Sequence, residues 1–91
     1  MEIEVYAMLR DVVGGKSIHI DGAPSMTVAQ VLEEIFVIHP VLHDKVLDKA
    51  GNLQSSVHLL INGRDVRYLD GLETVVTPQD RIHMFPPVGG G

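Results

Sequence analysis

The last residues of the sequence carry its clearest chemical signal. Residues 86–91 read Pro-Pro-Val-Gly-Gly-Gly. Proline lacks a backbone N–H and cannot continue a strand, so the two prolines predict a stiff exit from the residues before them. Glycine has no side chain, so three glycines fit a narrow channel and adopt backbone angles closed to other residues. The pattern predicts an extended tail over residues 85–91, with a reach of about 20 Å, that presents the carboxylate of Gly91.

A carboxylate at the end of such a tail is a poor electrophile at neutral pH and reacts only after activation. An enzyme that uses ATP and Mg²⁺ can convert it to an acyl-adenylate, which a sulfur donor, a thiol or an amine then attacks. These steps need a metal, groups that hold phosphate and a nucleophile, and we expect all of them on a partner protein. The alternative interpretation of the same residues is a frayed chain end with no function.

The remaining residues predict no catalytic or metal-binding site in the chain itself. The sequence has no cysteine, hence no thiolate nucleophile and no cysteine-ligated metal. Among five histidines, His39 and His43 are separated by the helix-breaking Pro40, and no carboxylate or cysteine completes a set with His58 and His83 by spacing. The three glycines precede no helix and therefore form no phosphate-binding loop. We expect a protein that is not an enzyme and binds no cofactor or metal.

Composition limits the possible partners and locations. The net charge is −5 and the pI is near 5.3, which argues against nucleic acid because phosphate binding needs clustered Lys and Arg. Surplus negative charge steers basic protein partners, and it also simply keeps a protein soluble. The start of the chain lacks a signal-peptide pattern, and no apolar run approaches the length of a membrane span. We expect a single cytoplasmic domain over residues 1–91 with no membrane partner.

Two strands are expected near the start of the chain. Residues 2–9 alternate between two faces, which predicts a strand. Residues 17–20 predict a second strand, and Gly14-Gly15 a turn between the two. The better core face of the first strand contains Ile3, Val5, Ala7 and Leu9.

One main helix is expected to follow. Thr27 and Gln30 have the spacing of a capping box at its start. Apolar residues recur along one stripe of this helix, at positions 28, 31, 32, 35 and 36. Pro40 disfavours helical geometry at His39, so the helix should end there. Apolar residues between 41 and 47 predict one more short helical turn, and residues 49–56 a surface loop.

The second half of the chain predicts the remaining strands. Residues 57–61 and 81–85 are apolar and alternating, and a short strand is expected at 65–68. Turns are expected at Asn62-Gly63 and at residues 77–80. A single amphipathic helix covers one face of a sheet, so the predicted fold class is two-layer α+β.

The uncovered face of that sheet is a candidate docking surface. Alternation places Val57, Leu59, Ile61, Ile82 and Met84 toward the helix. The residues between them then form an exposed apolar patch beside the root of the tail, and such patches often mark interaction sites. The patch contains Tyr6, Met8, Leu60 and Phe85.

Several segments together resemble one family over nearly the whole chain. Residues 5–11 are similar to its opening strand, residues 27–32 to its helix start, and residues 60–64 to its "VNG"-type strand end. Residues 80–88 with Gly90-Gly91 are close to its most specific stretch, which ends in "FPPVxGG". On these motifs the chain resembles the MoaD/ThiS family of sulfur carriers.

The resemblance implies a ubiquitin-like β-grasp fold, in which a mixed sheet of four to five strands packs on one main helix and a flexible Gly-Gly tail follows. It also implies that Gly91 is adenylated and then converted to a thiocarboxylate, with Gly90 required beside it. The implied partners are an E1-like adenylyltransferase, which uses ATP and Mg²⁺, and a sulfur acceptor such as the large subunit of molybdopterin synthase. The expected partner-binding residues are Tyr6, Met8, Leu60, Phe85, Pro86, Pro87, Val88 and Gly89.

Two other functions remain open from the sequence. Some relatives in this family form isopeptide bonds with lysines, so the chain is alternatively a ubiquitin-like modifier joined to target proteins through Gly91. The long segment 37–54 favours the molybdopterin-type or small-modifier branch over minimal thiamine-type carriers, without choosing between the two. The third possibility is an interaction domain whose tail does no chemistry.

Overall fold

A mixed sheet of five strands forms one layer of the protein. The computed structural model describes residues 1–86, and residues 87–91 lie outside the described part. The strand order is β2-β1-β7-β4-β5, with β1 and β7 parallel at the centre and the other neighbours antiparallel. The strands are β1 (Glu2–Val5), β2 (Ser17–His19), β4 (His58–Ile61), β5 (Arg64–Asp65) and β7 (Ile82–Phe85).

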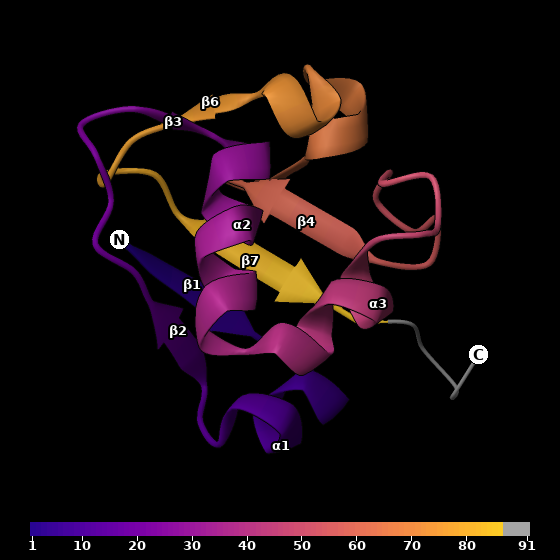
Figure 1. Ribbon diagram of the computed structural model, residues 1–91. Coiled ribbons are helices and arrows are strands. Elements are labelled where there is room, and N and C mark those ends of the chain that lie inside the picture. The colour runs from indigo at the N-terminus through magenta and orange to yellow at the C-terminus, as the bar shows by residue number, and fades with distance from the viewer. Residues whose placement is uncertain (87–91) are drawn as a thin grey trace.

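The main helix, α2 (Val28–Ile38), forms the second layer and lies across the sheet (Figure 1). Its predicted capping box is confirmed: Thr27 Oγ1 accepts the Gln30 N–H at 3.2 Å, and Gln30 Oε1 accepts the Thr27 N–H at 2.9 Å. Pro40 follows the helix end and opens a 3₁₀ turn, η1 (Pro40–Leu42), that leads into α3 (His43–Val46). The predicted helix end and the short helical turn are therefore also confirmed.

The first strand is shorter than the sequence predicts. β1 stops at Val5, and α1 (Met8–Val13) begins after a sharp turn at Ala7, whose φ is 52° and ψ is −133°. The Leu9 N–H reaches Tyr6 O at 3.2 Å, and Arg10 Nε donates to Val5 O at 2.9 Å, which closes the turn. Ala7 is exposed rather than in the core, while Leu9 is buried from the helix. The strand predicted over residues 2–9 is therefore wrong beyond Val5.

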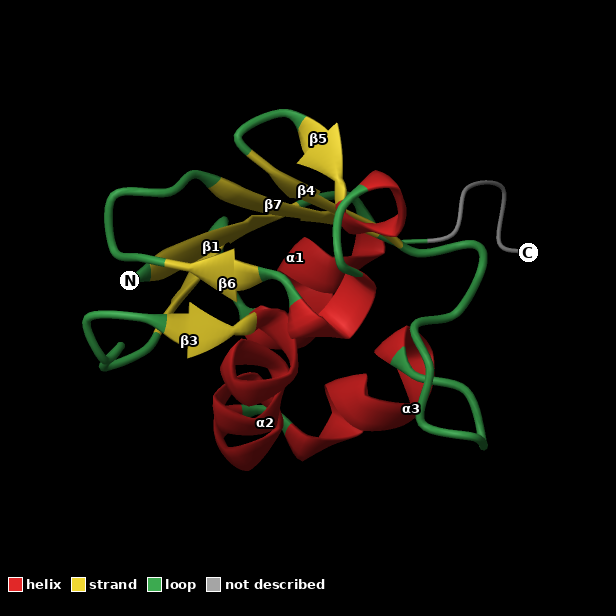
Figure 2. Cartoon of the chain, turned by 90° about the horizontal axis from the view of Figure 1, so that it is seen from above, coloured by secondary structure: helices red, strands yellow, loops and turns green. Residues whose placement is uncertain are grey.

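Four further short elements depart from the prediction or are not predicted. A small second sheet pairs β3 (Met26–Thr27) with β6 (Val75–Val76), and Figure 2 shows it beside the start of α2. After Asp65 the chain forms two 3₁₀ turns, η2 (Val66–Tyr68) and η3 (Gly71–Glu73), so the strand predicted over 65–68 is wrong beyond its first residue. The Asp65 carboxylate causes the change, because it accepts the Arg67 N–H at 2.9 Å and caps η2.

The core fills the space between α2 and the inner face of the sheet. All five side chains predicted to point inward from the last long strands are buried, as are those of Ile3 and Val5. The apolar stripe of α2 meets them, with Val28, Val31, Leu32 and Ile35 buried. This arrangement confirms the predicted α+β class and the β-grasp architecture. Within residues 1–86, no helix has the length and apolar character to cross a membrane.

Two turns at one end of the sheet are tied together by side chains. Asn62 and Gly63 have φ of 52° and 85°, which makes a tight hairpin turn between β4 and β5. Asn62 Nδ2 donates to Asp80 Oδ1 at 2.8 Å, and the Thr77 N–H donates to Asp80 Oδ2 at 2.7 Å. The Asn62 hydrogen bond, followed by that from Thr77, lowers the pKa of the Asp80 carboxyl below its ordinary value. The tie holds β4 against β7 at the end opposite the tail.

Replacing Ala7 by glycine should stabilise the fold. A non-glycine residue at this positive φ is strained, and glycine adopts the same angles without a Cβ clash. We expect Ala7→Gly to raise the free energy of unfolding by about 0.5–1 kcal/mol, measured by urea denaturation. Ala7→Val is the matched control and should lower it, because a β-branched side chain tolerates this region less. A glycine variant less stable than wild type would contradict the strain argument.

Candidate functional site

The candidate site surrounds the point at which the chain leaves the sheet. β7 ends at Phe85, and the next residue, Pro86, is buried where the strand stops. Residues 87–91 follow, so the predicted reactive residues Gly90 and Gly91 lie outside the described part of the chain. The predicted partner-binding residues at positions 87–89 lie outside it too. The described site is therefore the root of the tail and the outer face of the sheet, the face turned away from α2.

An aromatic stack fixes the last residue of β7. The rings of Tyr6 and Phe85 are nearly parallel, with centroids 4.2 Å apart and planes 7° apart. The Arg10 guanidinium lies 5.1 Å from the centroid of the Tyr6 ring. Arg10 is itself held by its bond to Val5 O, so a cation and two rings form an ordered stack. The stack joins the end of β1 to the residue from which the tail departs.

Tyr6 is further held by its hydroxyl group, which lies 3.0 Å from Glu4 Oε2 and 2.7 Å from His83 Nδ1. The phenol has one proton, so it donates to Glu4 when the His83 Nδ1–H donates to the phenol oxygen. Desolvation, and then the hydrogen bond and charge of Glu4, raise the pKa of Tyr6 above its ordinary value, against a smaller opposing effect of Arg10. The Tyr6 hydroxyl therefore stays protonated at neutral pH and keeps its hydrogen bonds to Glu4 and His83.

The predicted apolar patch is only partly assembled. Tyr6, Leu60 and Phe85 lie on the outer face and are half-buried. Met8 does not join them, because it lies on α1 rather than on a strand. It lines a separate, smaller hollow together with Lys45 and Pro86. The early end of β1 is the reason for this correction.

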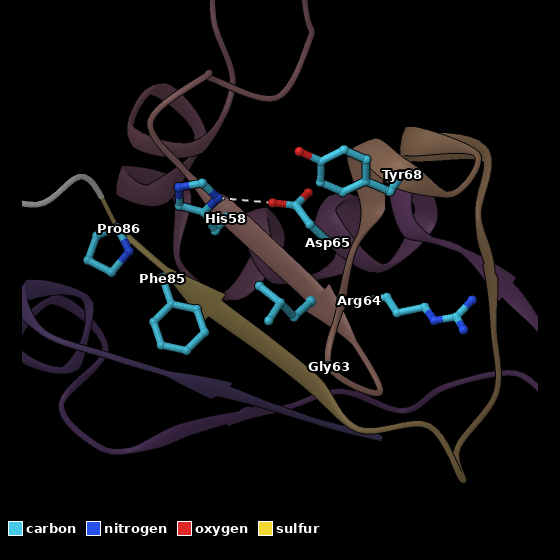
Figure 3. A pocket seen from close by; sticks show the side chains of 8 residues that line it. His58, Gly63, Arg64, Asp65, Tyr68, Phe85 and Pro86 are labelled. Atoms are coloured by element: carbon cyan, nitrogen blue, oxygen red, sulfur yellow. Dashed lines mark hydrogen bonds and ion pairs between the residues drawn. The ribbon is translucent and has the colours of Figure 1, made fainter.

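A wide hollow opens on the outer face beside Phe85 and Pro86; we call it the outer hollow. Figure 3 shows Phe85 and Pro86 on one side of β4 and Tyr68 on the other, with His58 and Asp65 between them. The complete lining is His58, Leu60, Gly63, Arg64, Asp65, Tyr68, Phe85 and Pro86.

The polar wall of the outer hollow is an internally paired network. His58 Nδ1 lies 2.9 Å from Asp65 Oδ2, and Asp65 also accepts from the backbone and side chain of Arg67 at 2.9 and 3.4 Å. Arg67 donates in turn to the carbonyl of Gln54. Burial is the largest single influence on Asp65 and raises its pKa, but the hydrogen bonds and charges of Arg67 and His58 together outweigh it. The pKa of Asp65 is therefore below its ordinary value.

Sequence reasoning missed this network and the exposed Tyr68. The outward position of His58 follows from strand alternation, but its pairing with Asp65 depends on the β4–β5 hairpin, which places Asp65 opposite Leu60 on the outer face. Among residues 1–86, no three His, Cys, Asp or Glu side chains are grouped to hold a metal ion. The rings of His58 and His83 turn to different partners, Asp65 and Tyr6.

Comparison with known proteins identifies the family. The model of the ThiS family matches residues 3–91, almost the entire chain. The chain belongs to the ThiS family. The resemblance drawn from the strand ends, the helix start and the Pro-Pro-Val stretch is thereby confirmed.

Proteins similar to this chain bear two kinds of name, modifier and sulfur carrier. Small archaeal modifier protein 3 of Haloferax volcanii is 35% identical over 91 residues, covering 100% of this chain and 98% of that protein. A putative sulfur carrier protein of Archaeoglobus fulgidus is 36% identical over 69 residues, covering 76% of this chain and 78% of that protein. A chain of the Amycolatopsis orientalis BexX/CysO complex is 30% identical, with a TM-score of 0.81 and coverage of 99% and 98%.

The Asp65 network should stabilise the fold in a pH-dependent way. The pKa of Asp65 in the folded chain is below the ordinary aspartate value of 3.8, which serves as the reference for the unfolded chain. The ionised Asp65 carboxylate therefore makes its full contribution to the free energy of unfolding above that pH. The contribution is lost as the pH falls through the pKa that Asp65 has in the folded chain. We expect Asp65→Asn to lower the free energy of unfolding by about 1 kcal/mol at neutral pH, and the difference from wild type to shrink in acid.

Urea denaturation over a pH series measures this difference. Asp21→Asn is the matched control, because Asp21 also faces a histidine, His19, but at 3.9 Å and with its side chain fully exposed. Such an exposed ion pair should contribute almost nothing to the free energy of unfolding. Equal effects of the two variants at neutral pH would show that the network is not stabilising. A constant gap between Asp65→Asn and wild type in acid would show that the stabilisation does not depend on the ionised carboxylate.

Proposed function

We propose that this chain is a sulfur carrier whose Gly91 carboxyl is activated as an acyl-adenylate and then converted to a thiocarboxylate. The observation that carries the proposal is the match of the ThiS family model through residue 91, which includes the β-grasp body and the Gly-Gly end together. The names of the sulfur carrier relatives support it. The proposal takes Gly91 as the carboxyl terminus of the mature chain.

The chemistry needs only a carboxylate from this chain. A carboxylate oxygen attacks the α-phosphorus of ATP and pyrophosphate leaves. Hydrosulfide from a sulfide donor then attacks the acyl carbon, the C–O bond to AMP breaks and AMP leaves, and loss of the sulfur-bound proton yields the thiocarboxylate. ATP and Mg²⁺ are held by an E1-like adenylyltransferase, and the sulfur passes to an acceptor enzyme such as the large subunit of molybdopterin synthase. The chain thus acts as a cytoplasmic carrier and not as an enzyme.

The structure around Pro86 and the length of chain that follows it support such delivery. The Arg10, Tyr6 and Phe85 stack fixes the end of β7, so the tail starts from a defined point. The five residues that follow Pro86 span about 17 Å when extended. A partner that holds the Gly91 carboxyl in its active site must therefore cover the surface around Pro86. We propose that the apolar residues Leu60 and Phe85 form part of that contact.

A second function shares the first chemical step. The 35% identity to small archaeal modifier protein 3 over the whole chain favours a role as a protein modifier. In that case the amine of a target lysine, rather than sulfur, attacks the acyl-adenylate and forms an isopeptide bond. Arg81 is the last lysine or arginine of the sequence, so trypsin would leave residues 82–91 as a branch on the modified lysine. Detection of that branch on cellular proteins would establish the modifier function beside the carrier function.

Intact mass spectrometry tests the carrier proposal directly. The protein is incubated with ATP, Mg²⁺, a sulfide donor and the adenylyltransferase from the same organism. We expect a mass gain equal to the replacement of one oxygen by sulfur, located on the C-terminal peptide. A variant without Gly90 and Gly91 is the control and should gain nothing. An unchanged mass and no trapped adenylate would leave an interaction domain with an idle tail.

Leu60 tests the proposed contact on the outer face. Its side chain is half-buried on the outer face, so Leu60→Ser should leave the fold intact while it removes apolar contact area. We expect the KM of the adenylyltransferase for this variant to rise by about tenfold with kcat little changed. Thermal unfolding serves as the control for folding. A large loss of stability would mean that Leu60 belongs to the core, and an unchanged KM would exclude it from the contact.

A further inference from the structure

β2 is an edge strand of the main sheet, and half of its backbone groups are directed away from the sheet. The Val5 N–H donates to the carbonyl of Lys16 at 2.9 Å, so Lys16 is turned toward β1. Residues of an antiparallel pair alternate between bonded and outward positions, so Ser17 and His19 direct their N–H and C=O groups outward. Figure 1 shows β2 at the margin of the sheet, and no strand within residues 1–86 pairs with its outer side. This edge can therefore accept an added strand.

A second stripe of α2 borders the end of this strand. Glu34, Val37 and Ile38 have the spacing i, i+3 and i+4, so they share one face of the helix, outside its buried stripe. Val37 is 81% exposed and Ile38 is 51% exposed. Together with residues 19–21 they line a groove of about 230 Å³, which we call the β2 groove. This volume is below the roughly 300–1,000 Å³ of small-molecule sites, so the groove suits side chains of a protein partner.

The charged groups of the β2 groove favour a basic side chain. Glu34 Oε2 is buried and has no hydrogen-bond partner in the described part of the chain. Asp21 is fully exposed, and its carboxylate lies 3.9 Å from the ring of His19, too far for a hydrogen bond. The N-terminal ammonium is already bonded to the carbonyl of Ile20, and Lys16 precedes the opposite end of β2. Two carboxylates face one weakly paired histidine, so a Lys or Arg of a partner gains a charged hydrogen bond here.

A second copy of this chain fits the groove poorly. Pairing of two copies along β2 would bring the Asp21 and Glu34 carboxylates of both chains to one edge, and each chain has a net charge of −5. Such like charges repel. Lys16 at the start of the strand is also the kind of charged residue that protects an edge against self-association. The charges therefore favour a different protein, with basic residues, as the occupant.

We propose that β2 and the β2 groove bind an extended segment of another protein. The segment adds a strand to β2 and places a Lys or Arg against Glu34 and an apolar side chain against Val37 and Ile38. Main-chain hydrogen bonds to Ser17 and His19 supply affinity, and the two side chains supply specificity. Alternate side chains of a strand are about 6.6 Å apart, and Glu34 and Ile38 are about 6 Å apart along α2. Two side chains on one side of the segment therefore reach both ends of the groove.

This site is separate from the root of the tail. β1 lies between β2 and β7, the strand that leads to Pro86, and the groove is lined by α2 rather than by the outer face of the sheet. A segment bound at β2 therefore leaves the outer hollow uncovered. The surface can hold one protein while the tail is delivered to another, and the inference does not depend on activation of Gly91.

Selection from a display library of random linear peptides, with the full chain immobilised, tests the proposal. We expect the enriched peptides to alternate apolar residues with Lys or Arg. When such a peptide is added to the isotope-labelled chain, the amide signals of residues 17–21 and 34–38 should shift. A chain without Gly90 and Gly91 should bind the same peptide with equal affinity, which separates this result from that of the carrier proposal.

Three variants test the parts of the contact, and thermal unfolding checks that each is folded. Val37→Ser and Glu34→Gln should each weaken peptide binding by about five- to tenfold, and Glu34→Gln should make binding less sensitive to salt. Ser17→Pro removes an outward N–H at the first strand position, where proline is tolerated, and should weaken binding by a similar factor. Val75→Ser is the matched control and should bind like wild type, because Val75 is 62% exposed on β6, beside the start of α2.

Several results would overturn the proposal. These are the absence of any enriched sequence, and an affinity that Val37→Ser and Glu34→Gln leave unchanged. Shifts confined to Leu60 and Phe85 would place the peptide on the outer face instead. Shifts of the β2 amides that grow with protein concentration, without peptide, would assign the edge to a second copy. An unchanged affinity of Ser17→Pro would refute the added strand.

Discussion

The parallel pairing of β1 with β7 is the constraint on which the rest of the structure depends. Ile3 lies opposite Ile82 and Val5 opposite Met84, so both central strands turn the same residues toward α2. The two strands come from opposite ends of the sequence, and closing so long a loop costs conformational entropy. Burial of their inward side chains offsets that cost. The strand that leads into the tail is therefore held in the middle of the sheet, between two neighbours, rather than at a free edge.

The features that could be predicted from the sequence are those set by neighbouring residues. Thr27 and Gln30 fix the start of α2 within one turn, and strand alternation fixes which residues of β4 and β7 face the core. Leu9 shows why the first strand was misjudged. Its burial fits the alternation of a strand, yet Leu9 lies on α1 and reaches the core from there. The turn before it depends on a positive φ at Ala7, and alanine is not a residue type from which a positive φ is predicted.

In the candidate site too, some features follow from neighbouring residues and others depend on contacts between distant ones. Tyr6 and Phe85 could be placed on the outer face from alternation, but their stacking requires the β1–β7 register, which no local pattern contains. The pairing of His58 with Asp65 depends on the hairpin turn, and the capping of η2 by Asp65 converts an expected strand into a 3₁₀ turn. That turn also leaves Tyr68 exposed beside the hollow. Contacts between residues that turn geometry brings together in space could therefore not be predicted from the sequence.

The proposed function separates a reactive tail from a recognition surface, and this separation has a consequence for specificity. In the proposed function, the acyl-adenylate of Gly91 is the same electrophile whether sulfur or a lysine amine attacks it. A Gly-Gly end therefore cannot by itself select the pathway, and the choice falls to the proteins that the body admits within reach of the tail. On this chain the surface within that reach is the stack around Tyr6 and the outer hollow walled by Tyr68. Differences in that surface between relatives, more than differences in the tail, should decide which partners receive the activated carboxyl.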